Sequence, residues 1–297
     1  MSFPETKTLI AEHIYINEIL RPEFLTIKGN HLIVSSSQTD PTLYVYSLPS
    51  LTFLNAGVHK GRGPHEIATF PMFCESPGAE MLYVWGYSPT SIGKNEIGMD
   101  GSLSFKEIIE IDIPETFNNM SIINDSLFIY YLPDNLTIKK YNLKTQEQID
   151  LISLKKDDHK ESYFYSNRGH VASNATHLTY SYAFKKQIDI YDINSFKLTK
   201  IIKWSDLEQA LTPGDFGALT YHYRSVYMGE KYFYALYGGN EEKDPKDLRL
   251  EVYDYDGSPV REYMLDTKIR MFVVDETNSV LYGFSSQIDD YFIKYNL

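Results

Sequence analysis

The stretch His177-Leu-Thr-Tyr-Ser-Tyr-Ala-Phe-Lys-Lys-Gln-Ile-Asp-Ile-Tyr-Asp-Ile-Asn194 contains two short runs rich in aromatic and β-branched residues. Such runs, here His177–Tyr182 and Gln187–Tyr191, are typical of β-strands when turn-forming residues bound them. The second run ends in an aromatic residue, and a polar turn at Tyr191–Asn194 follows it. The stretch therefore predicts a hairpin and a turn into a further strand.

The same unit recurs along the chain. The turns that close it are Tyr46–Ser50, Gly98–Gly101, Tyr141–Lys144, Tyr191–Asn194, Tyr253–Gly257 and Tyr295–Leu297. The earlier strands of the unit are His31–Val34, Met81–Val84, Ser126–Tyr130, His177–Tyr182, Tyr232–Tyr237 and Ser279–Phe284. Copies spaced by roughly 40–50 residues are typical of four-stranded propeller blades. We therefore predict an all-β fold, a single six-bladed β-propeller domain with four-stranded antiparallel blades over residues 1–297.

The two ends of the chain support a closed ring. The last repeat stops after its third strand, whereas a spare strand, Thr8–Ile16, precedes the first repeat. If the spare strand fills the vacant outer place, no sheet edge is left open there. We therefore expect the N-terminal strand to close the ring.

One helix is expected outside the blades. Residues Asp206–Leu211 follow Ser205, a favoured N-cap residue, and precede Pro213-Gly214, a pair that ends helices. This helix falls in the long interval between the fourth and fifth copies.

Composition narrows the classes of partner. Forty acidic and 28 basic residues give a net charge of -12. A surface this acidic repels phosphate backbones and anionic lipid, so we expect no nucleic acid partner.

Cys74 is the only cysteine, which excludes an intrachain disulfide and any CxxC site. Its apolar neighbours predict a buried small side chain. We expect a monomer.

Neither a membrane span nor a leader is evident. No segment approaches the roughly 18 apolar residues of a transmembrane helix. Residues Met1–Arg21 alternate in polarity and lack the basic and apolar regions of a signal peptide. A periplasmic or cell-surface location would follow if a leader had been removed, and a cytoplasmic one otherwise.

The segment Gly61-Arg-Gly-Pro-His-Glu-Ile-Ala-Thr-Phe-Pro71 lies where the first blade passes to the second. It resembles the G-x-G-P-G-E-F-x-x-P signature of bacterial TolB-like and NHL-like six-bladed propellers, except that His65 replaces a glycine and Ile67 a phenylalanine. The resemblance implies a propeller of the kind often carried by secreted or lipoprotein-anchored proteins, many without known activity. Physically, glycines allow a tight crossing, Glu66 can accept backbone N–H bonds and Pro71 can start the next inner strand.

Polar residues on the innermost strands are the best candidates for a site, because those strands line the central channel. Arginine binds carboxylates in bidentate fashion and tyrosine stacks on rings, so a basic, aromatic-lined pocket would suit a small anionic or sugar-like ligand. Equally, these arginines could pair with blade carboxylates, because buried charges need partners. The candidate ligand-binding residues are Arg62, His65, Arg168, His170, Tyr221, His222, Arg224 and Arg270.

Three functions remain open. The leading hypothesis is a non-catalytic binding or scaffolding propeller without a cofactor, which presents a channel mouth to a small-molecule ligand or a protein partner. The enzyme alternative is a calcium-dependent, lactonase-type hydrolase with Glu23, Asn119 and Asn167 as metal ligands. A third is a pure interaction module with a water-filled channel. The chain has no G-x-S-x-G, P-loop or H-E-x-x-H motif.

Overall fold

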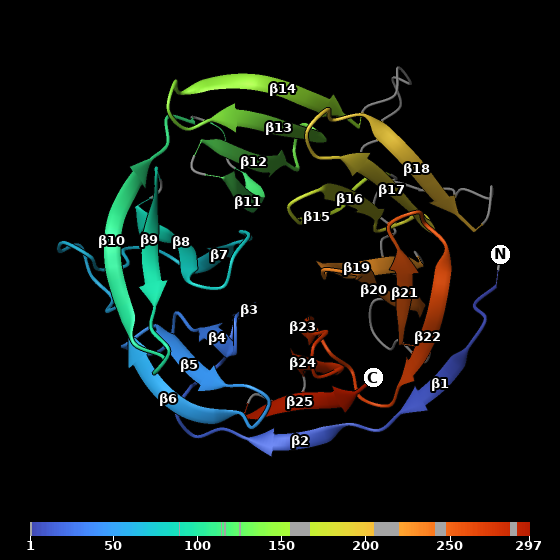
Figure 1. The fold of residues 1–297 in the computed structure, drawn as a ribbon, viewed down its shortest axis with the longest axis horizontal. Coiled ribbons are helices and arrows are strands. Elements are labelled where there is room, and N and C mark those ends of the chain that lie inside the picture. The colour runs from blue at the N-terminus through green and yellow to red at the C-terminus, as the bar shows by residue number, and fades with distance from the viewer. Residues whose placement is uncertain are drawn as a thin grey trace.

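Short aromatic and β-branched runs separated by tight turns fold into strands arranged radially around a central axis (Figure 1). The computed structural model describes residues 2–88, 90–113, 115, 117–124, 126–154, 167–204, 220–240, 248–285 and 290–297. These residues form six sheets and no helix. The helix expected at Asp206–Leu211 lies outside the described residues.

Each sheet is one antiparallel blade, numbered here in chain order, and its strands follow one another from the axis outward. Blade 1 is β3 (Phe24–Lys28), β4 (His31–Ser35), β5 (Leu43–Ser47) and β6 (Thr52–Gly57). Blade 2 is β7 (Met72–Cys74), β8 (Met81–Ser88), β9 (Ser91–Ile97) and β10 (Leu103–Glu110). Blade 3 is β11 (Asn118–Asn124), β12 (Leu127–Leu132), β13 (Thr137–Asn142) and β14 (Glu147–Ser153).

The second half of the ring repeats this order. Blade 4 is β15 (Gly169–Ser173), β16 (His177–Tyr182), β17 (Gln187–Asp192) and β18 (Leu198–Lys203). Blade 5 is β19 (Tyr221–Met228), β20 (Tyr232–Asn240), β21 (Arg249–Asp254) and β22 (Pro259–Leu265), with β1 (Thr6–Leu9) outside them. Blade 6 is β23 (Met271–Asp275), β24 (Val280–Phe284), β25 (Tyr291–Asn296) and β2 (Glu12–Tyr15). The predicted repeat is confirmed in each blade.

The hydrophobic core is divided among the blade interfaces. The buried apolar residues gather in six clusters, each drawn from two neighbouring blades. Between blades 6 and 1, for example, the rings of Phe292 and Tyr46 meet edge to face with centroids 5.1 Å apart. Many buried rings are tyrosines, and their hydroxyls find partners, as in the Tyr131–Tyr180 pair at 3.0 Å. The abundance of tyrosine therefore follows from interfaces that need both apolar area and internal hydrogen bonds.

The N-terminal segment closes the ring, as predicted. Strand β2 pairs antiparallel with β25, so the blade that contains the last strand of the chain is completed by one of the first (Figure 1). The expectation of one continuous strand at Thr8–Ile16 is wrong, because β1 pairs in parallel with β22 of blade 5 instead. One straight strand cannot follow the edges of two radially splayed blades, and the strand is interrupted between them at Ile10–Ala11. The Ala11 N–H donates to the Asp266 carboxylate there (3.0 Å).

The innermost strands of the blades begin at one face of the ring, which we call the entry face. The connection from blade 1 to blade 2 contains the Gly61–Pro71 motif. Within it, the Gly63 N–H donates to Glu66 Oε2 (2.8 Å). A Cβ on Gly61 would lie 1.8 Å from that oxygen, so the glycine makes room for the carboxylate. His65 has φ 69°, so a residue with a side chain adopts a left-handed backbone at the position where the signature has a glycine.

No helix of the described part of the chain has the length and apolar character needed to cross a membrane.

Candidate functional site

Four of the predicted site residues come together at the entry face, where blades 4 and 5 meet. Arg168 directly precedes β15, His170 lies on β15, and Tyr221 and Arg224 lie on β19. His170 Nε2 is 3.1 Å from the Tyr221 hydroxyl, and the Arg224 guanidinium carbon is 5.0 Å from the Tyr221 ring centroid. We call these four residues the blade 4–5 cluster.

Two glycines position the cluster by letting strands approach closely. A Cβ on Gly169 would lie 2.2 Å from the Ser181 carbonyl oxygen, so β15 can sit against β16 only with glycine there. A Cβ on Gly238 would lie 2.5 Å from Arg224 Nε, so the guanidinium packs over a position of β20 that has no side chain. The backbone of Arg168 is held by the Ala183 N–H, which donates to its carbonyl (2.8 Å).

The Arg224 guanidinium lacks the partners that a buried cation needs. Its Nε and Nη2 atoms are buried and make no hydrogen bond within the described part of the chain. Arg168 is exposed and adds a second guanidinium to the same corner. Burying a charged donor without an acceptor is costly, so the cluster is a place where an anion would be stabilised.

The electrostatics of the cluster act on His170. Burial, together with the charges of Arg168 and Arg224, lowers the pKa of His170 to about 4. The imidazole is therefore neutral at pH 7, and it can share one hydrogen bond with the Tyr221 hydroxyl. A negative charge held by the two arginines would raise this pKa again.

His222 lies apart from the cluster. Its Nδ1 is 3.3 Å from the Tyr237 hydroxyl, and burial and the charge of Lys186 lower its pKa to about 4. The Lys186 ammonium is 4.4 Å from the Tyr237 ring centroid and forms an ion pair with buried Glu251 (3.2 Å). His222 therefore belongs to a closed internal ion-pair site between the blades. Burial is the largest cause of the lowered pKa at both histidines, and the neighbouring cations come second.

The other predicted ligand-binding residues lie elsewhere on the entry face. Arg270, at the start of blade 6, directs Nη2 toward the Glu23 carbonyl oxygen (3.5 Å). Arg62 is exposed in the connection from blade 1 to blade 2. The His65 imidazole packs on Phe105 of β10, the outermost strand of blade 2, with centroids 3.9 Å apart. None of these contacts joins Arg62, His65 or Arg270 to the blade 4–5 cluster.

The residues proposed as calcium ligands have different surroundings and share no contact among the residues that the structure describes. Both oxygens of Glu23 accept hydrogen bonds from Ser37 (2.6 and 2.7 Å), and Asn167 Oδ1 accepts one from Lys185 (3.1 Å). Asn119 is exposed on β11 with φ 46°. Within the described ranges, no three His, Cys, Asp or Glu side chains lie close enough to hold a metal ion.

Sequence reasoning missed a carboxylate network at the opposite end of the channel. Glu75 directly follows β7, and its Oε2 accepts a hydrogen bond from the Ser173 N–H at the end of β15 (2.9 Å). Ser173 Oγ donates to Ser121 Oγ (2.7 Å), so blades 2, 3 and 4 are tied together. The Glu75 side chain is exposed, but desolvation by the surrounding strands outweighs the Ser173 N–H and the charge of Lys28 and raises the pKa of its carboxyl to about 7. The sequence signal for site residues lies at the starts of the inner strands, whereas Glu75 follows a strand end.

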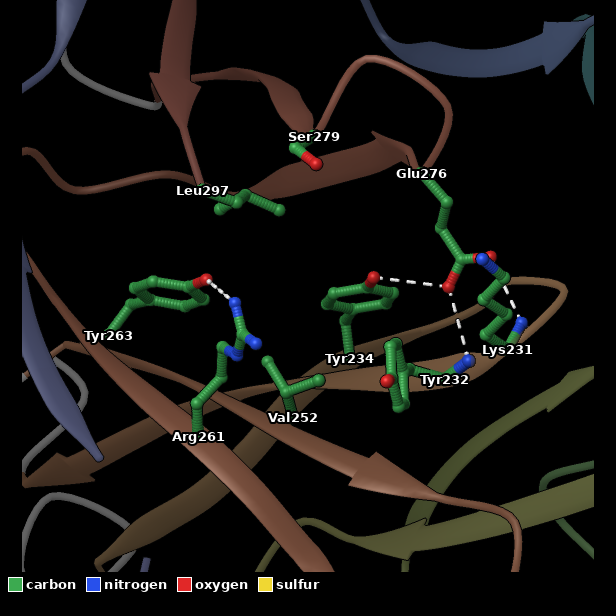
Figure 2. Close-up of a pocket in the computed structure, with 9 residues that line it drawn as sticks. All are labelled: Lys231, Tyr232, Tyr234, Val252, Arg261, Tyr263, Glu276, Ser279 and Leu297. Carbon is green, nitrogen blue, oxygen red and sulfur yellow. Dashed lines mark hydrogen bonds between the residues drawn. The ribbon is translucent and has the colours of Figure 1, made fainter. Parts of the chain in front are cut away.

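A further carboxylate shapes a hollow at the same end, between blades 5 and 6. Figure 2 shows Glu276 directed at Tyr234 and at the backbone of Tyr232, and Arg261 directed at Tyr263. Glu276 accepts hydrogen bonds from the N–H groups of Glu230, Lys231 and Tyr232 (2.7–3.1 Å) and from the Tyr234 hydroxyl (3.1 Å). Its carboxylate is thus used to cap the β19–β20 turn.

Cys74 is buried, and burial raises the pKa of its thiol far above the usual range. This disfavours the thiolate that a cysteine nucleophile requires.

Known structures share this architecture. A candidate exported protein from Bacteroides fragilis superposes with a TM-score of 0.62 at 11% identity, covering 98% of both chains. The U3-55K protein matches with a TM-score of 0.57 at 10% identity, over 97% of this chain and 98% of its own. Raptor from Chaetomium thermophilum matches with a TM-score of 0.53 at 11% identity, over 97% of this chain and 29% of its own. At these identities the likeness establishes the fold alone.

The comparison with curated proteins gives no match. The family model described as TolB-like 6-blade propeller-like matches residues 2–277. The match extends over nearly the whole chain and agrees with the six blades and with the Gly61–Pro71 motif. The chain therefore belongs to the TolB-like six-bladed propeller family.

Proposed function

We propose that this propeller is a non-catalytic binding protein, and that its blade 4–5 cluster binds a small carboxylate or similar anion at the entry face. The observation that carries the proposal is the buried Arg224 guanidinium, whose Nε and Nη2 have no partner within the described residues. A carboxylate would supply the missing acceptors in the geometry that guanidinium groups favour.

The neighbours of Arg224 suit such a ligand. Arg168 adds a second positive charge, and the neutral imidazole of His170 can donate or accept one hydrogen bond. Tyr221, 5.0 Å from the guanidinium carbon, offers a ring face beside the charge. Arg224 and His170 are only partly buried as residues. The net charge of -12 would make this corner a local exception on an acidic protein.

The test is a titration of the His170 imidazole by NMR, alone and with acetate, citrate, glucuronate or inorganic phosphate. A bound anion offsets the charges of Arg168 and Arg224, so the pKa of His170 is expected to rise from about 4 toward the ordinary histidine value. Arg224→Gln should abolish this response. Arg261→Gln, which changes an arginine on β22 of blade 5, is the matched control and should keep it. An unchanged His170 pKa with all four anions would refute the proposal.

A further inference from the structure

A second hollow, of about 300 Å³, lies between blades 1 and 2 beneath the Gly61–Pro71 motif. Side chains from the motif, from the end of blade 1 and from the strands of blade 2 surround it. The lining residues that carry the argument are His65, Glu66, Tyr87, Asn95, Leu103 and Phe105. His65 is exposed at its rim, so the hollow can be reached from solvent.

Asn95 has an unsatisfied side-chain amide in this wall. It lies on β9 and is 1% exposed. The Tyr87 hydroxyl donates to its Oδ1 (3.3 Å), while its Nδ2 has no partner within the described residues. Turning the amide over would pair Nδ2 with the hydroxyl and leave Oδ1 without a partner, so one amide atom is unsatisfied in either orientation. A buried amide that is half satisfied is stabilised by a ligand that completes its hydrogen bonds.

The motif directs polar groups toward the same hollow. Glu66 uses Oε2 to hold the Gly63 N–H, and its other oxygen makes no hydrogen bond within the described residues. His65 adopts a left-handed backbone, φ 69°, and its ring packs against Phe105. A side chain in this conformation is uncommon and is stabilised by the contacts around it.

The lining defines the chemical class of ligand. Asn95 Nδ2 needs a hydrogen-bond acceptor. The Glu66 carboxylate is an acceptor for a ligand donor, and the Tyr87 hydroxyl can donate or accept a hydrogen bond. One ligand hydroxyl can accept from Asn95 Nδ2 and donate to Glu66, and a second ligand hydroxyl can donate to the Tyr87 hydroxyl oxygen. An anion would be repelled by the Glu66 carboxylate, and a cation would not supply the acceptor that Asn95 needs. Leu103 and Phe105 offer apolar surface for a C–H face.

We propose that this hollow binds a neutral, hydroxyl-bearing ligand of about the size of one sugar ring. A volume of about 300 Å³ is at the lower end for small-molecule pockets, which limits the ligand to a single ring. This site is separate from the blade 4–5 cluster, and the two proposals stand independently.

The experiment is calorimetric titration of the full chain with D-glucose, D-galactose, D-mannose and glycerol. At least one of these is expected to bind, and Asn95→Leu is expected to weaken that binding at least tenfold. Arg224→Gln, in the blade 4–5 cluster, should bind with the parent's affinity.

Three outcomes would overturn the proposal. They are no binding of any of the four compounds, binding that survives Asn95→Leu, and glucuronate binding in this hollow as tightly as glucose. If Asn95→Leu does not fold, the side-chain amide resonances of Asn95 in the parent serve as the readout. They should shift on addition of the bound sugar, and an unchanged signal at saturating sugar rejects the site.

Discussion

Glu75 and Ser173 are joined across the channel, although 98 positions separate them in the chain: the Ser173 N–H donates to the Glu75 carboxylate at 2.9 Å. The bond links blade 2 with blade 4, and Ser121 of blade 3 completes the network. Because the pKa of Glu75 is raised to about 7 in the folded protein, the fold is less stable when this carboxyl is charged than when it is protonated. Its protonation therefore couples the stability of the ring to pH.

The first prediction concerns that coupling. Between the ordinary glutamate pKa, about 4.5, and about 7, the folded protein binds more protons at Glu75 than the unfolded chain does. The free energy of unfolding contributed by Glu75 should therefore fall as pH rises through this range and level off above about 7. Urea denaturation of the parent and of Glu75→Gln at several pH values measures it. The free energy of unfolding of the parent minus that of Glu75→Gln should fall as pH rises from about 4.5 to about 7. A difference that does not depend on pH would contradict the coupling.

The second prediction concerns the N-terminal segment. Phe3 stacks on Trp204 with centroids 5.2 Å apart, and β1 and β2 pair with blades 5 and 6. Deleting residues 2–16 should lower the melting temperature of the whole protein, because two blade edges and an aromatic contact are exposed. Phe3→Ala alone should cost about 1–2 kcal/mol, since the ring is only half-buried. Calorimetry measures both, and an unchanged melting temperature after the deletion would contradict ring closure by this segment.

The third prediction concerns the buried ion pair of Lys186 and Glu251. Glu251 is 0% exposed and also accepts hydrogen bonds from Tyr223 (3.0 Å) and Tyr253 (2.6 Å). Lys186→Met should cost about 3–5 kcal/mol, because it leaves a buried carboxylate without its cation. Adding Glu251→Gln should recover much of this loss, since the amide oxygen is neutral and still accepts from the tyrosines. Urea unfolding of the single and double variants tests it, and equal instability of both would contradict the assigned cause.

The same pair offers a spectroscopic check. The charge of Lys186 contributes to the low pKa of His222, about 4. In Lys186→Met the pKa of His222 should therefore rise, whereas the pKa of His170 should be unaffected. NMR titration of the two imidazoles distinguishes the two sites.

The fourth prediction concerns His65. Both His65→Ala and His65→Gly remove the ring contact with Phe105, but only glycine adopts φ 69° without a steric penalty. The glycine variant should therefore be more stable than the alanine variant by about 1 kcal/mol. Chemical denaturation of the two variants measures this, and a more stable alanine variant would argue against a strained backbone at His65.

The blades could be predicted from the sequence because each repeats a local pattern. Aromatic runs such as Gln187–Tyr191 and the turns that follow them are encoded within a few residues. The surplus strand before the first repeat also indicated closure. Its division into β1 and β2 could not be predicted, because it depends on the angle between two blades that are far from it in sequence.

The site could be predicted only in part. Placing His170, Tyr221 and Arg224 on innermost strands, with Arg168 directly before one of them, was sufficient to bring them together. His222 follows Tyr221 directly but contacts Tyr237 instead. Regular alternation would put Arg224 on the same side as His222, and the register shifts of β19 between Tyr221 and Tyr223 and between Tyr223 and Ser225 could not be predicted from the sequence. The unsatisfied amide of Asn95 had no sequence signal, because it depends on how β9 packs beneath a distant loop.

Ring closure also has a consequence for how the protein is made. Strands β1 and β2 precede every blade in the chain, whereas their partners β22 and β25 belong to the fifth and sixth blades. Until residue 291 has been translated, the nascent propeller is an open arc whose edge strands can pair with other chains. Strands β1 and β2 must therefore remain unpaired while the blades between them and their partners are synthesised.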